Sequence, residues 1–122
     1  MEPEFTITEL PDYLHIQYSG EFRLAEAKSS VDAMLDSCRQ SGSTKVLFDC
    51  TAMSGELTVM DRFNVGQYTS EKMDPGLKIA MVVDEKYILP DNFFEVVARN
   101  RGIYINVTSE MEEAIEWLRS SK

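Results

Sequence analysis

The chain has 122 residues, of which 43% are hydrophobic and 27% are charged. One ordinary globular domain has this length and composition, which argues against a disordered chain and against a miniprotein that needs disulfides to fold. The net charge of -9 repels nucleic-acid phosphates and anionic lipid headgroups, so neither nucleic acid nor a membrane surface is expected as a partner.

The cysteines and the first residues indicate the cellular setting. Cys38 and Cys50 are the two cysteines, and two thiols in an ordinary core favour a reducing compartment over a disulfide framework. The start at Met1 has neither the basic residues nor the apolar segment of a secretory signal, and no run approaches the ~20 apolar residues that span a bilayer. We therefore expect a cytoplasmic protein without a membrane span.

The first predicted elements form an antiparallel hairpin. Apolar and polar residues alternate over 5–10 and again over 13–18, and Pro11-Asp12 supplies the turn between them. His15 falls on the polar side of the second strand, where we expect it to be solvated. Gly20 then breaks the alternation.

A helix and a buried strand follow the hairpin. Apolar residues recur at steps of three and four from Leu24 to Cys38, which predicts an amphipathic helix that stops at Gly42. Its start has no serine, threonine or aspartate as N-cap. The run 44–50 is apolar on both faces at its centre, which is typical of a central strand covered on both sides, and Asp49 closes it.

The second helix has a clearer start. Thr58 takes the N-cap position with Asp61 three residues later, which is an imperfect capping box, and Pro75-Gly76 ends the helix. Residues 77–83 form another continuous apolar run and hence another central strand.

The C-terminal part repeats this alternation. Pro90-Asp91 starts a third helix, and Gly102 closes it. Residues 103–107 alternate as a half-buried strand. Ser109 and Glu112 then form a capping box for a last helix with an apolar stripe.

The order of these elements predicts a single α/β domain over residues 1–122. Strands that alternate with helices pair in parallel through right-handed crossovers. We therefore expect a mixed, mostly parallel sheet of about five strands with about four helices, antiparallel only at the first hairpin. The residues expected to be buried are Val46, Phe48, Ile79, Met81, Val83, Val97, Ile115 and Leu118.

The sequence offers little catalytic equipment. His15 is the one histidine, and neither cysteine has a reason to approach it, so no Ser-His-Asp or Cys-His mechanism is indicated. Asp49 and Asp84 both end apolar strands, where two carboxylates can hold a magnesium ion, but neither a third ligand nor a phosphate-binding loop accompanies them. We favour the alternative that both accept backbone hydrogen bonds. No enzyme activity, metal or cofactor is expected.

Short fragments in a fixed order link the chain to a known family. They are Asp49, Gly55-Glu56-Leu57-Thr58, Asp61-Arg62, Phe94-Glu95, Asn100-Arg101-Gly102, Glu113-Ala114 and Trp117-Leu118. With the order of elements, they make nearly the whole chain resemble the STAS domain of bacterial anti-sigma-factor antagonists, and more specifically the SpoIIAA-like family. That family is described as sharing its fold with STAS and lipid-binding SEC14 domains. The resemblance implies a fold and a regulatory, protein-binding behaviour rather than an activity.

One motif of the antagonists is missing. They are switched by phosphorylation of a serine in an Asp-Ser-Ser-Gly-like motif at the start of the second helix. This chain lacks the motif, and its nearest hydroxyl groups are those of Ser54 and Thr58. The resemblance therefore implies a protein partner without implying the same switch.

The segment that leads from the central strand into the second helix is the predicted working surface. Loop residues there are exposed while the strand beneath holds them, and the free N–H groups of a helix start favour an anionic group. A partner or ligand is therefore expected to contact Ser54, Gly55, Glu56, Thr58, Asp61 and Arg62. Reversing the charge of Arg62 is expected to weaken binding and to leave the melting temperature nearly unchanged.

Two alternatives stay open. The SEC14 side of the resemblance suggests a carrier or sensor of a small apolar or anionic ligand. Met60, Phe63, Met73 and Phe93-Phe94 can line an apolar groove for it, although such side chains at helical spacing are more often core. A homodimer is the second alternative.

Overall fold

A computed structural model describes residues 2–72, 76–88 and 104–120. Its elements run in the order β1 (Glu4–Glu9), β2 (Leu14–Glu21), α1 (Leu24–Ser41), β3 (Lys45–Ser54), α2 (Val59–Lys72), β4 (Lys78–Val83), the 3-10 turn η1 (Glu85–Tyr87), β5 (Tyr104–Thr108) and α4 (Met111–Arg119). This order confirms a hairpin followed by alternating strands and helices. The described residues hold three α-helices and η1 rather than about four helices. The helix expected from Pro90 to Gly102, with Val97, lies outside them.

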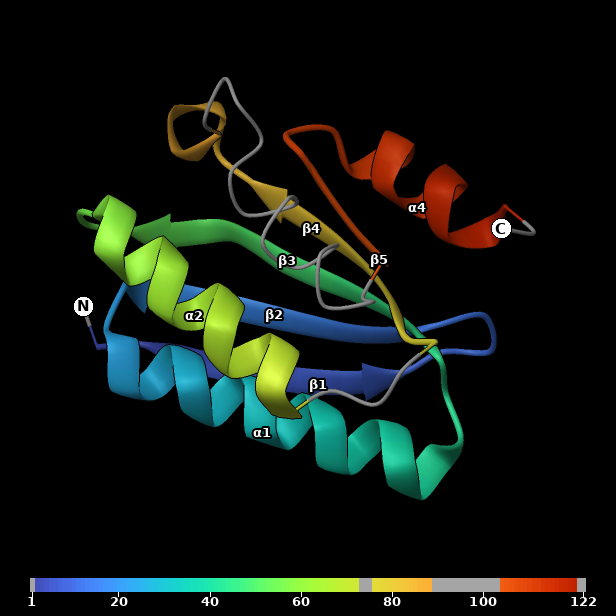
Figure 1. The fold of residues 1–122 in the computed structure, drawn as a ribbon. Coiled ribbons are helices and arrows are strands. Elements are labelled where there is room, and N and C mark those ends of the chain that lie inside the picture. Colours follow the sequence, from blue (N-terminus) through green and yellow to red (C-terminus); the bar gives the residue numbers. More distant parts are fainter. Residues whose placement is uncertain (1, 73–75, 89–103, 121–122) are drawn as a thin grey trace.

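The five strands form one mixed sheet in the order β1-β2-β3-β4-β5. β1 pairs with β2 antiparallel, and every other neighbouring pair is parallel, as expected. Figure 1 shows α1 and α2 on one face of this sheet and α4 on the other. β3 is therefore the central strand, and both its faces are covered over part of its length.

Alternation along β3 divides the core between these two faces. Val46 and Phe48 pack in the cluster on the side of α1, while Leu47 packs with Ala114 and Leu118 of α4. Fully burying an aliphatic side chain of this size stabilises the fold by about 1.5–3 kcal/mol. Of the residues expected in the core and described here, all are buried except Met81 and Ile115, which are half-buried.

Two strands are longer than expected. β3 runs on to Ser54, so Asp49 lies inside the strand instead of closing it. β2 likewise continues through Gly20 to Glu21. The two extensions pair with each other beyond a register shift that follows Gln17, and this pairing sustains both of them without an apolar run.

The start of α4 also differs from the expected capping box. The helix begins at Met111 after Glu110, whose side chain makes no capping hydrogen bond. The hydroxyl of Thr108 instead accepts a hydrogen bond from the N–H of Glu110 at 3.1 Å and donates one to Glu113 at 3.3 Å. Thr108 is the last residue of β5, so the turn is built from the strand end rather than from Ser109.

Candidate functional site

The six residues predicted as the working surface form one continuous stretch from the end of β3 into α2. Ser54 ends the strand, and its carbonyl accepts the N–H of Phe22 at 2.8 Å. Glu56 and Thr58 are exposed, while Leu57 between them is half-buried against the core. The loop therefore presents polar residues outward from a backbone that is fixed to the sheet.

Thr58 and Asp61 form a complete, reciprocal cap at the start of α2. The N–H of Thr58 donates to the Asp61 carboxylate at 3.0 Å, and the N–H of Asp61 donates to the Thr58 hydroxyl at 3.0 Å. This confirms Thr58 as the N-cap. The Asp61 carboxylate already lies in the favourable field of the helix start, so an external anion there would compete with an internal one.

The cap gives a direct stability prediction. Thr58→Ala removes the hydroxyl acceptor and is expected to lower the free energy of unfolding by about 0.5–2 kcal/mol. Thr58→Ser keeps an acceptor in the same place and is expected to cost much less. Urea unfolding of both variants measures the difference. Equal losses would show that the hydroxyl does not stabilise the helix.

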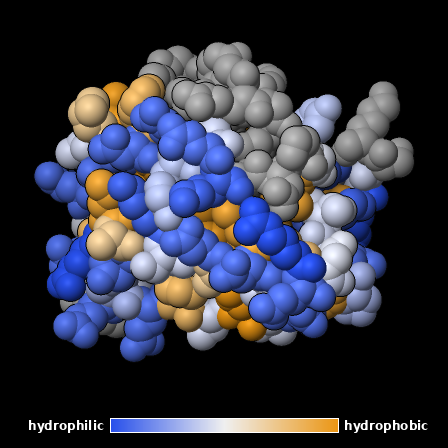
Figure 2. All heavy atoms as spheres, turned by 60° about the horizontal axis from the view of Figure 1, so that its bottom comes forward, coloured by the Kyte–Doolittle hydropathy of each residue, from blue (hydrophilic) through white to orange (hydrophobic). Residues whose placement is uncertain are grey.

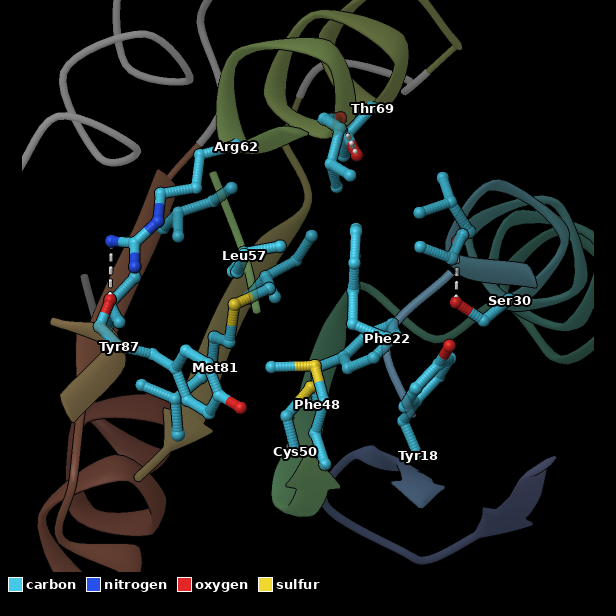
Figure 3. A pocket seen from close by; sticks show the side chains of 18 of the residues that line it. Tyr18, Phe22, Ser30, Phe48, Cys50, Leu57, Arg62, Thr69, Met81 and Tyr87 are labelled. Carbon is cyan, nitrogen blue, oxygen red and sulfur yellow. Dashed lines mark hydrogen bonds between the residues drawn. The ribbon is translucent and has the colours of Figure 1, made fainter. Parts of the chain in front are cut away.

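Arg62 and Gly55 are both tied to Tyr87, a residue that the sequence did not single out. The Arg62 Nη1 donates to the Tyr87 carbonyl at 2.6 Å, and the Tyr87 hydroxyl donates to the Gly55 carbonyl at 2.6 Å. Tyr87 is buried, and Figure 3 shows it beside Arg62 on one side of a cavity. Tyr87 therefore fixes the loop before α2 and the first turn of α2 to the segment that follows β4.

The Arg62 side chain is half-buried rather than a freely exposed cation. Burial lowers the pKa of its guanidinium. Its Nε is buried and has no hydrogen-bond partner in the part of the chain that the structure describes. Arg62 is thus held by the bond from Nη1, while its buried Nε donor is unused.

The first turn of α2 carries apolar side chains on the outside of the molecule. Val59 is 57% exposed, Met60 64% and Phe63 37%. Met60 and Phe63 had been considered as lining of a ligand groove or as core. Their exposure argues against the core, and the groove stays a prediction. Met73 and Phe93-Phe94 lie outside the described residues. Exposed apolar side chains that gather beside polar ones are typical of binding surfaces.

A cavity of about 100 Å³ lies between the sheet and the helices α1 and α2. Its walls are mostly apolar side chains, and Figure 3 shows Tyr18 and Ser30 across it from Arg62 and Tyr87. Cys50 lies in its wall, and burial raises the pKa of this thiol to about 12. A thiol that stays protonated is a poor nucleophile, so Cys50 is a packing residue here.

His15, Asp49 and Thr51 meet on the other face of the sheet. Asp49 is 6% exposed and accepts hydrogen bonds from the N–H and the hydroxyl of Thr51, at 3.0 and 2.7 Å. His15 is half-buried, not solvated as expected, with its Nε2 3.7 Å from the Asp49 carboxylate. Asp84 accepts the N–H of Lys86 at 3.1 Å and caps η1. Both aspartates thus accept backbone hydrogen bonds, which was the favoured alternative.

The described residues hold neither a cluster of three metal-ligating side chains nor a membrane-spanning helix. Among residues 2–72, 76–88 and 104–120, no three His, Cys, Asp or Glu side chains are placed to hold a metal ion together. No helix among them is both long enough and apolar enough to cross a membrane.

The fold is shared with solved structures although the sequence has no match among family models or curated proteins. An anti-sigma factor antagonist from Mycobacterium paratuberculosis has a TM-score of 0.67 and 11% identity over 98% of this chain and 96% of that one. An uncharacterised protein with a SpoIIAA-like fold from Shewanella loihica has a TM-score of 0.53 and 16% identity over 95% of this chain and 93% of that one. Likeness at such identities concerns the fold alone. This chain has the SpoIIAA-like fold that its sequence resemblance implied.

Proposed function

We propose that this protein is a non-enzymatic regulatory module that binds a partner protein at the start of α2. The contact region, named the α2 entry surface, comprises Ser54, Gly55, Glu56, Thr58, Val59, Met60, Asp61 and Arg62. The observation that carries the proposal is the exposure of Val59 and Met60, at 57% and 64%, within a predominantly polar stretch. Water contact with such side chains is unfavourable, and a partner would relieve it.

The backbone of this surface is held in place before any partner arrives. The hydroxyl of Tyr87 fixes Gly55, and the reciprocal bonds between Thr58 and Asp61 fix the helix start. A surface that is already ordered loses little conformational entropy on binding. This rigidity favours recognition of a folded partner through a preformed patch.

The charge around the surface indicates the chemistry of the partner. Glu56 is exposed beside the apolar side chains, and Glu21 lies against Gly55 at the end of the neighbouring strand. The whole chain carries a net charge of -9. A partner with basic residues around an apolar contact would therefore be attracted to this face.

The likeness to an anti-sigma factor antagonist supports the class of function but not its details. That protein is described as an antagonist of an anti-sigma factor, and we carry over to this chain only regulation by protein contact. A phosphorylation switch is not part of the proposal, because the Thr58 hydroxyl already accepts a hydrogen bond in the helix cap. The buried thiols of Cys38 and Cys50 fit the cytoplasm as the place of action.

Met60→Lys tests the surface with little risk to the fold. A lysine here opposes both the apolar contact and a basic partner, so binding of a captured partner is expected to weaken by at least about tenfold. Met60 is exposed, so the free energy of unfolding is expected to change by less than about 0.5 kcal/mol. The measurement is affinity capture with wild type, followed by calorimetric titration of the purified partner.

Leu10→Lys is the matched control. Leu10 is also an exposed apolar residue, but it lies in the turn between β1 and β2, at the opposite end of the strands from the α2 entry surface. The control is expected to bind as wild type does. A partner that binds both variants equally would place the interface elsewhere. If the wild type self-associates and Met60→Lys abolishes this, the partner at this surface would be a second copy of this chain and not another protein.

A second role is favoured by the cavity beside Arg62. We infer that the protein also senses a small apolar ligand, as an addition to partner binding. Lipid carriage of the SEC14 kind is not part of this proposal, because the cavity is far below the ~300–1,000 Å³ of pockets that enclose drug-sized ligands. A cavity of about 100 Å³ is too small for a lipid chain pair.

A further inference from the structure

The cavity beneath α2 is apolar, and most of its polar groups are already satisfied. The Ser30 hydroxyl donates to the Ala27 carbonyl at 2.7 Å, and the Thr69 hydroxyl donates to the Val65 carbonyl at 2.7 Å. The hydroxyl of Tyr87 is bound to a loop carbonyl at 2.6 Å. None of these hydroxyl protons is left for a ligand, so a ligand that depends on neutral donors is not favoured.

Arg62 is different from the other polar groups in the cavity wall. Its Nη1 is bound to the Tyr87 carbonyl, but its Nε is buried without an acceptor among the described residues. A buried donor with no acceptor is unfavourable. Partial burial also lowers the pKa of this guanidinium. A carboxylate would supply the missing acceptor, and its charge would strengthen that hydrogen bond.

The size of the cavity limits the rest of the ligand. An apolar cavity of ~150 Å³ takes up benzene, so a smaller one fits a short or branched aliphatic chain. The methionines Met34, Met53 and Met81 contribute to the wall, and their flexible side chains adapt to such a chain. Figure 3 shows Leu57 and Met81 beside Arg62 among the side chains that line the cavity.

We propose that this cavity binds a small aliphatic carboxylic acid of about four or five carbons, with its chain in the apolar space and its carboxylate on Arg62. This rests on and deepens the ligand-sensing role, and the cavity shares Arg62 with the α2 entry surface. Inorganic phosphate has no apolar part to fill the cavity, and a neutral alcohol has no negative charge to pair with Arg62, so both are disfavoured as ligands. The ligand class is therefore set by both features together.

The test uses the full chain with isotope-labelled methionine methyl groups and sodium isovalerate as the probe. Met34, Met53 and Met81 report on the cavity, while Met111 packs on the opposite face of the sheet. Isovalerate is expected to shift the three cavity methyl signals saturably and to leave the Met111 signal in place. Isoamyl alcohol, which has the same apolar body without the charge, is expected to bind at least about fivefold more weakly.

Arg62→Met removes the donor and keeps an unbranched apolar side chain. It is expected to weaken isovalerate by about tenfold, to the level of the alcohol. Arg119→Met is the matched control, because Arg119 is exposed and paired with Asp12 at 3.3 Å. This control is expected to bind as wild type does.

The outcomes separate the two features of the proposal. No saturable shift of the cavity methyl signals would overturn the binding site. Equal affinity of wild type for isovalerate and isoamyl alcohol would overturn the part assigned to Arg62, and this comparison needs no variant to fold. Neither result bears on partner binding, which Met60→Lys tests separately.

Discussion

Gly20→Ala is expected to lower the free energy of unfolding by about 2–5 kcal/mol. Gly20 has a φ of 91°, a conformation that residues with a side chain rarely adopt. A Cβ at this position would overlap the carbonyl oxygen of Glu2 and lie 2.9 Å from the carbonyl carbon. Relieving that overlap would displace the chain next to Glu4, whose pairing with Ser19 begins the ladder between β1 and β2.

Gly42→Ala is the control that separates backbone strain from steric overlap. Gly42 follows α1 with a φ of 77°, and a Cβ there would meet nothing within 4 Å. Gly42→Ala is expected to lower the free energy of unfolding by about 1 kcal/mol, because only the strained backbone conformation opposes it. Urea unfolding measures both variants. Losses of the same size would show that the approach of Glu2 to Gly20 is not a constraint.

The fold could be predicted because its signals are local. The alternation over β1 and β2 and the unbroken apolar runs of β3 and β4 reflect how each strand is covered. The ends of the strands had no such signal. Ala52 to Ser54 extend β3 by pairing with β2, more than thirty residues earlier in the chain, and no pattern within the segment predicts that pairing.

The candidate site likewise has parts that the sequence could predict and parts that it could not. The cap at Thr58 could be read from Asp61 three residues later, because both groups belong to one helical turn. The similar spacing of Ser109 and Glu112 was misleading, since the hydroxyl of Thr108 organises that turn. A capping motif thus marks a helix start more reliably than it marks the atom that caps it.

Tyr87 had no local signal at all. Its hydroxyl meets Gly55 across 32 residues of sequence, and its carbonyl meets Arg62 across 25. Only the packing of η1 beside α2 brings these groups together. The exposure of Val59 and Met60 could not be predicted from the sequence either. It depends on which side of α2 packs against the sheet, and the docking of the helix decides that.

Arg62→Glu is expected to lower the free energy of unfolding by about 2–4 kcal/mol, which differs from the expectation drawn from sequence. A freely exposed cation could be reversed at little cost, but Arg62 is half-buried in the wall of an apolar cavity. The substitution would remove the donor to the Tyr87 carbonyl and place a carboxylate opposite that oxygen. Two acceptors facing each other without a proton are mutually repulsive.

Two companion variants locate the origin of this loss. Arg62→Met removes the hydrogen bond but adds no anion, and is expected to cost about 1–2 kcal/mol. Arg23→Glu reverses an exposed charge before α1, where the side chain makes no capping hydrogen bond, and is expected to change stability by less than about 0.5 kcal/mol. Urea unfolding ranks the three. If Arg62→Glu were as mild as Arg23→Glu, the bond from Arg62 to Tyr87 would not hold the first turn of α2, and Arg62 would be free to act as the surface cation that the sequence suggested.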